Sequence, residues 1–181
     1  MKDKNPFNKE CNSFAQKFDE ALDAQDWDAT QRTIRDAESY ISKHSGPQYT
    51  PIYYSIATAY SDLAKNKSEC MNDTVREKAL YYFRTALDLL ISHSLKDPIF
   101  QPYVLGLQLP LLTNYANALS STGRKTASIR YYRKVLEISP EFSMAKGNIG
   151  VELLSYSRLF QDPGHQNYLR AIPHNAKSAK M

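Results

Sequence analysis

The stretch LPLLTNYANALSSTGRKTASIRYYRKVLEISP, residues 109–140, decides the fold of this chain. Two helical patterns stand on either side of Gly123, which supplies the positive φ that ends a helix cheaply. The small residues Ala116 and Ser128 stand where two antiparallel helices would approach closely. Pro140 ends the second pattern, because its ring cannot continue a helix. The stretch therefore predicts a hairpin of two helices.

The spacing of these residues resembles that of a tetratricopeptide repeat, a helix-turn-helix unit of about 34 residues. With Leu109 as position 1, small residues occupy positions 8 and 20, and large ones occupy positions 4, 7, 11 and 24, namely Leu112, Tyr115, Leu119 and Tyr132. The resemblance implies an all-α, right-handed solenoid of stacked hairpins. It also implies a binding surface without chemistry of its own.

Two more hairpins are predicted upstream in the same register. The second spans about residues 50–95, and an insertion of 10 residues is expected in its turn, around the polar segment Asn66–Thr74. The first spans about 8–44 and is degenerate, because Phe18 and Thr30 fit the small positions poorly. Terminal repeats are often atypical in this way.

The third hairpin is expected to span 103–140, because apolar residues recur every four positions from Tyr103 to Leu119. Its first helix would begin near Pro102 and bend at Pro110. The alternative is a separate short turn over 103–109. Residues 141–161 predict a capping helix or the first half of a fourth repeat, and 166–181 a polar tail.

Composition agrees with one helical domain over residues 1–165. No run of apolar residues approaches the roughly 18 needed to cross a bilayer, no secretory signal is visible, and strand patterns are absent. Two cysteines, Cys11 and Cys70, make no disulfide framework, and we interpret them as a core residue and an exposed thiol. We expect a cytoplasmic protein that is not associated with a membrane.

A second resemblance is more particular. The runs 111–119, 123–124, 142–150 and 162–165 are similar to the repeat region of prokaryotic proteins in which a tetratricopeptide segment precedes a HEPN domain. HEPN domains are helical modules associated with RNA cleavage and with defence. The resemblance covers about residues 81–165 and implies an RNA-associated or defence role as the alternative function. The HEPN domain would follow His165, so we expect none before Met181.

Arg158 and His165 form the only arrangement that suggests catalysis. Six residues lie between them, and this spacing resembles that of the Arg and His pair of HEPN ribonucleases. The helix-breaking run Asp162-Pro163-Gly164 separates the two side chains, so we predict that His165 packs or caps a helix end instead. No metal-ligand or nucleophile pattern is present elsewhere. We therefore predict a protein that is not an enzyme and has no cofactor or metal.

Partner binding is the favoured hypothesis. In solenoids of this family the first helices of successive hairpins line the concave face, which implies a groove for a peptide or partner protein. The residues expected there are Tyr54, Thr58, Asp62, Thr113, Asn114, Asn117, Ser121, Asn148 and Val151. The three asparagines either bind a peptide backbone or tie helices together.

Charge is distributed unevenly along the chain. Residues 1–108 carry 13 basic and 15 acidic side chains, and residues 109–181 carry 10 and 4. Five of the basic residues form a stripe on the second helix of the third hairpin: Arg124, Lys125, Arg130, Arg133 and Lys134. Such a stripe is able to bind nucleic acid, but a solvated outer surface is the favoured interpretation.

Overall fold

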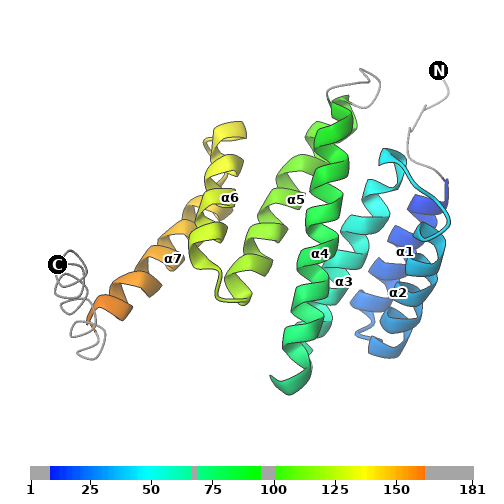
Figure 1. Ribbon diagram of the computed structural model, residues 1–181, viewed down its shortest axis with the longest axis horizontal. Helices are drawn as coiled ribbons and strands as arrows, with labels where there is room; N and C mark the ends of the chain where they lie inside the picture. Colours follow the sequence, from blue (N-terminus) through cyan, green and yellow to red (C-terminus); the bar gives the residue numbers. More distant parts are fainter. Residues whose placement is uncertain (1–8, 67–68, 95–100, 162–181) are drawn as a thin grey trace, which may run out of the picture.

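The computed structural model describes residues 9–66, 69–94 and 101–161 (Figure 1). Within these ranges the chain is helical, and no described residue lies in a strand. The elements are α1 (Lys9–Asp23), α2 (Trp27–Ile41), the 3-10 helix η1 (Pro47–Tyr49), α3 (Thr50–Asn66), α4 (Glu69–Ser94), α5 (Gln101–Ser121), α6 (Lys125–Ile138) and α7 (Ser143–Gln161).

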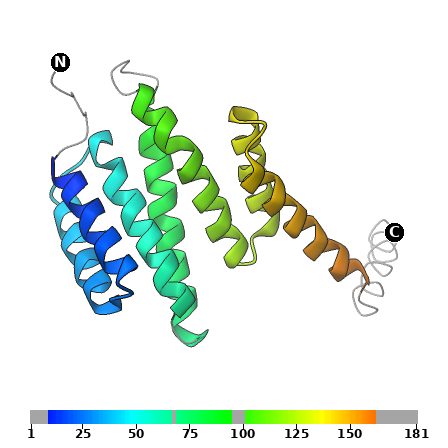
Figure 2. The same cartoon turned by 180° about the vertical axis from the view of Figure 1, so that it is seen from behind.

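The helices pair into hairpins that stack in sequence order. The pairs α1–α2, α3–α4 and α5–α6 each pack together, α3 also contacts α1 and α2, and α5 also contacts α4 and α3. The second helices α2, α4 and α6 lie on the side of the molecule seen in Figure 1, and α1, α3, α5 and α7 lie on the side seen in Figure 2. The predicted all-α, repeat-like fold is confirmed.

The core forms where the repeat register places small residues between large ones. The predicted close-contact residues Ala116 and Ser128 are buried, and so are the small residues Ala57, Ala79 and Ala86 of the second hairpin. In the first hairpin Phe18 and Thr30, which fit the small positions poorly, are buried as well. The two helices of this hairpin therefore pack through larger side chains than those of the other hairpins. The expectation that Cys11 lies in the core is also confirmed, and its thiol donates to the Gln48 carbonyl at 3.2 Å.

The turn between α5 and α6 follows the geometry that Gly123 predicts. Its φ is +76°, and its N–H donates to the Ser120 carbonyl at 2.9 Å. The next N–H, that of Arg124, donates to the Leu119 carbonyl at 2.9 Å. These two bonds satisfy carbonyls that the end of a helix leaves unpaired, as in a Schellman motif.

The turn between α1 and α2 has the same two bonds without a glycine. Gln25 occupies the left-handed position with φ +53°, and the Asp26 N–H donates to the Ala21 carbonyl at 2.9 Å. A side chain in this conformation costs about 1–2 kcal/mol, which glycine avoids at a smaller entropic cost.

We therefore expect Gln25→Gly to stabilise the protein by about 0.5–1 kcal/mol and to raise its melting temperature by about 1–4 °C. A thermal melt followed by circular dichroism measures the effect. Ala24→Gly, one residue earlier in the same turn, is the control and should lower the melting temperature. An unchanged or lower melting temperature for Gln25→Gly would contradict the strain at this position.

The prediction that the inserted residues of the second hairpin form a turn is wrong. Residues 69–74 belong to α4, which is 26 residues long and begins at Glu69. The segment contains no glycine or proline to stop a helix, and acidic residues suit a helix N-terminus. Asp73 also pairs with Arg76 one turn later, at 3.5 Å. The extra residues therefore lengthen the second helix.

The first helix of the third hairpin is a single helix, α5, that begins at Gln101 and contains Pro110. The prediction of one long helix is confirmed, and the alternative of a separate turn over 103–109 is not. Pro102 lies in the first turn, where a missing N–H costs nothing. Pro110 removes a donor from the Gly106 carbonyl, and Gly106 is exposed, so water can replace that bond.

Candidate functional site

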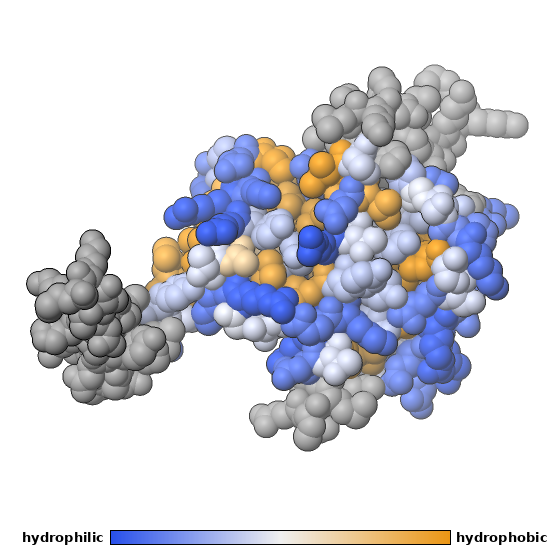
Figure 3. Space-filling model, viewed as in Figure 1, coloured by the Kyte–Doolittle hydropathy of each residue, from blue (hydrophilic) through white to orange (hydrophobic). Residues whose placement is uncertain are grey.

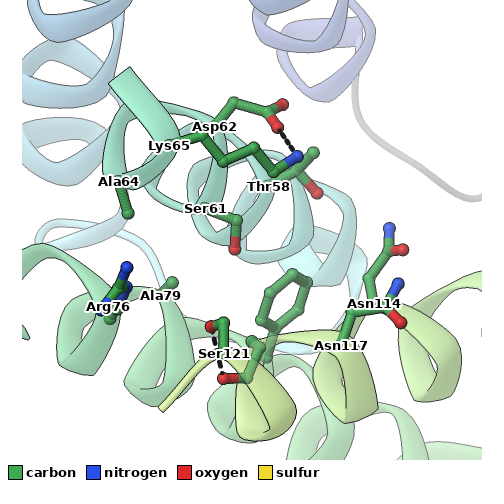
Figure 4. Close-up of a pocket in the computed structure, with 12 residues that line it drawn as sticks. Thr58, Ser61, Asp62, Ala64, Lys65, Arg76, Ala79, Asn114, Asn117 and Ser121 are labelled. Atoms are coloured by element: carbon green, nitrogen blue, oxygen red, sulfur yellow. Dashed lines mark hydrogen bonds and ion pairs between the residues drawn. The ribbon is translucent and has the colours of Figure 1, made fainter. Parts of the chain in front are cut away.

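A small cavity of about 170 Å³ lies between α3, α4 and α5. Figure 4 shows residues of α3 above the cavity and residues of α4 and α5 below it. Ala79 and Phe83 of α4 form an apolar floor. The walls carry hydroxyl, amide and charged groups from Thr58, Ser61, Asp62, Asn114, Asn117 and Ser121.

Helical spacing brings these side chains together. Tyr54, Thr58 and Asp62 are four residues apart and lie on one face of α3. Asn114, Asn117 and Ser121 follow the same rule on α5. Of these six residues, all of which were expected in the groove, five line the cavity. Tyr54 does not line it, but its hydroxyl accepts a hydrogen bond from Asn114, which does. The sequence register therefore located one shared concavity.

The cavity contains charges of both signs. The Lys65 ammonium lies 2.6 Å from the Asp62 carboxylate on α3. Arg76 approaches from α4, and its ion pair with Asp73 is long, at 3.5 Å. Sequence reasoning missed Arg76, because it considered only first helices and placed the residues just before Arg76 in a turn.

Hydrogen bonds across the cavity wall join the second and third hairpins. The Asn114 Nδ2 group donates to the Tyr54 hydroxyl at 2.7 Å. Burial raises the pKa of Tyr54, although hydrogen bonds from Thr58 and Asn114 oppose that rise. Thr113, another expected groove residue, is buried, and its hydroxyl donates to the Leu109 carbonyl at 2.8 Å. Thr113 therefore cannot touch a partner directly.

Asn117 and Asn148 both take part in helix-to-helix contacts. The Asn117 Oδ1 atom accepts from the Tyr132 hydroxyl at 2.6 Å and from Asn148 Nδ2 at 3.0 Å. These bonds join α5, α6 and α7, so the interpretation of these asparagines as ties between helices is supported. Asn117 is nevertheless exposed, and its Nδ2 group makes no hydrogen bond with the described residues.

Val151 lies apart from the cavity. It belongs to α7 at the end of the solenoid, and its side chain is exposed. The expected groove is therefore a cavity between the second and third hairpins together with a separate exposed surface on α7.

The basic stripe divides into paired and unpaired residues. Arg124 pairs with Glu77 of α4 at 2.7 Å, and Lys125 pairs with the buried Glu152 of α7 at 2.8 Å. Lys134 lies over the Tyr131 ring, 4.8 Å from its centre. Arg130 and Arg133 remain exposed on α6. Ion pairs therefore neutralise two of the five cations, which lowers the positive charge that this surface has available to bind nucleic acid.

A second concavity, which sequence reasoning did not anticipate, is a groove of about 620 Å³ between α4, α5 and α6. Hydrophobic side chains are visible between α4 and α6 in Figure 3. Leu112 and Tyr115 of α5 lie in the groove, and Ile91 and Ile138 flank it. The register had assigned this side of the molecule to a solvated outer surface.

The described residues show no metal centre. They contain no group of three potential metal ligands. Arg158 is exposed on α7, and His165 lies outside the described residues, so the pairing of these two residues is not tested. None of the described helices is both long enough and apolar enough to cross a membrane.

Comparison with known proteins agrees with the third hairpin. Residues 109–142 match the tetratricopeptide repeat family, a range that covers α6, most of α5 and the turn that joins them. A comparison with curated proteins found no match. The chain is thus an all-α helical-repeat protein that carries a tetratricopeptide repeat, and repeats of this class generally serve as protein-interaction scaffolds.

Proposed function

We propose that the protein is a non-catalytic scaffold that binds a peptide segment of a partner protein in the cavity between α3, α4 and α5. The observation that carries the proposal is a set of polar groups that line the cavity without internal partners among the described residues. These are the Ser61 hydroxyl, the Asn114 Oδ1 atom and the Asn117 Nδ2 group.

These groups suit the backbone of an extended peptide. A peptide in this conformation presents N–H donors and C=O acceptors that repeat along its length, and the cavity offers acceptors and donors from facing helices. The helix-to-helix bonds of Asn114 and Asn117 hold both amides in place before binding, which lowers the entropic cost of association. Lys65, Asp62 and Arg76 would then discriminate among charged side chains of the partner.

A peptide library tests this proposal. The full chain is used to select binders from a random 12-residue library displayed on phage, and the selected peptides are measured against variants. Ser121→Arg fills the cavity from an exposed position whose hydroxyl bonds only to the nearby Ala118 carbonyl. We expect Ser121→Arg and Asn117→Arg each to weaken binding at least tenfold, about 1.4 kcal/mol.

The matched control changes the opposite side of the third hairpin. The double variant Arg130→Glu/Arg133→Glu should bind the same peptides within about twofold, because surface substitutions away from a site have small effects. Loss of binding in this double variant alone, with a steep dependence on salt, would instead favour the basic surface and a nucleic-acid partner.

A further inference from the structure

Helix α7 packs on the preceding hairpin through a side that combines polar residues with the buried Ala145 and the partly buried Ile149. Asn148, Glu152 and Tyr156 are four residues apart and share that side. Asn148 bonds to Asn117, Glu152 accepts hydrogen bonds from Ser120 and Lys125, and Tyr156 bonds to Thr126 at 2.5 Å. The attachment of α7 therefore relies on polar as well as apolar contacts.

The opposite side of α7 is apolar and uncovered by the described residues. Met144, Val151 and Leu154 are 55%, 62% and 54% exposed. Together with Gly147 they follow the spacing i, i+3, i+7, i+10, which is that of the seam of a coiled coil. We call these four residues the α7 seam. At Gly147 a Cβ would meet nothing within 4 Å, so a partner can approach the backbone closely.

The charge at the C-terminal end of the α7 seam is positive. Arg158 continues the line of the α7 seam beyond Leu154, is exposed and makes no ion pair with a described residue. Lys146, the other exposed cation of α7, pairs with Glu141 at 3.0 Å, and the only acidic residue of α7, Glu152, is buried. Two copies joined at this end would bring like charges together, because residues 109–181 carry 10 basic and 4 acidic side chains.

We propose that the α7 seam is a docking site for an amphipathic helix of a partner protein, with an apolar stripe flanked by acidic side chains. The apolar stripe packs on Met144, Val151 and Leu154, and the acidic side chains lie against Arg158. This site is separate from the cavity between α3 and α5 and does not depend on the function proposed for it.

Two synthetic peptides test the proposal with the full chain. Both are labelled helices of three heptads with leucine at the seam positions, and one carries glutamate and the other lysine at the flanking positions. Fluorescence anisotropy measures their dissociation constants. We expect the acidic peptide to bind roughly tenfold more tightly than the basic one at low salt, and the difference to shrink as salt is added.

The chain offers a matched pair of variants. Leu153 and Leu154 are adjacent and equally exposed, at 53% and 54%, but the 100° step of a helix turns Leu153 away from the α7 seam. We expect Leu154→Glu to weaken binding of the acidic peptide at least roughly tenfold, and Leu153→Glu to leave it within about twofold. Circular dichroism confirms that both variants fold.

Several results would overturn the proposal. They are equal binding of the two peptides, no binding of the acidic peptide to the full chain, or the same loss in both leucine variants. Light scattering on the unliganded protein provides a further test. A dimer that Leu154→Glu dissociates would show that a second copy, and not a partner helix, occupies the α7 seam.

Discussion

Replacement of Phe83 by alanine is expected to destabilise the protein by about 3–5 kcal/mol, which is a large part of the stability of a domain of this size. Phe83 is fully buried on α4, and its ring centre lies 6.2 Å from that of Tyr54 on α3 and 6.3 Å from that of Tyr115 on α5. Truncation removes the aromatic contact to both neighbouring helices and leaves a cavity at the junction of the second and third hairpins. Chemical denaturation gives the free energy of unfolding.

Tyr81→Ala is the matched control, since Tyr81 is an aromatic residue of the same helix with 63% of its surface exposed. Its loss should cost no more than about 0.5–1 kcal/mol, mainly from the edge contact with Tyr82, whose ring centre lies 5.1 Å away. Similar losses for the two variants would show that the second and third hairpins do not share the core described here.

The hairpins could be predicted because their signals are local. Alternation of small and large residues along 109–140, with Gly123 and Pro140 as stops, specifies two helices and the side on which they meet. The long α5 was also predictable, because the apolar period runs through Pro110. The start of α4 was not, because a polar segment without glycine or proline reads equally well as a loop or as a helix extension.

The cavity could be predicted only in part. The register identifies which residues of α3 and α5 point to the concave side, and Thr58 and Asn117 indeed share one concavity. It does not show that Arg76 reaches the same space from α4, because that depends on how far α4 extends. It also misjudged Thr113, whose exposure is decided by how closely neighbouring hairpins pack.

The polarity of α7 is a further feature that the sequence did not reveal. The repeat register placed Val151 on the concave side of the solenoid, and this side chain is exposed. The inner side of α7 combines the buried Ala145 and the partly buried Ile149 with Glu152, to which Ser120 and Lys125 of the preceding hairpin both bond. Complementary polar groups far apart in sequence cannot be recognised without the contacts themselves.

Glu152→Ala is therefore expected to destabilise the protein by about 1–3 kcal/mol and to loosen α7 in particular. Glu152 is 3% exposed and is the shared acceptor of Ser120 and Lys125. Its removal leaves two donors, Ser120 of α5 and Lys125 of α6, without their acceptor. Lys125 keeps partial access to water, so the loss should fall below that of a fully buried ion pair.

Glu141→Ala is the control, because Glu141 forms a Glu–Lys pair of similar length with Lys146, at 3.0 Å, but is itself 92% exposed. An exposed pair of this kind contributes about 0–1 kcal/mol, so this variant should melt close to the wild-type temperature. Amide hydrogen exchange should localise the effect of Glu152→Ala to residues 143–161, with α3 and α4 still protected. Equal effects of the two substitutions, or uniform loss of protection, would mean that Glu152 does not hold α7 in place.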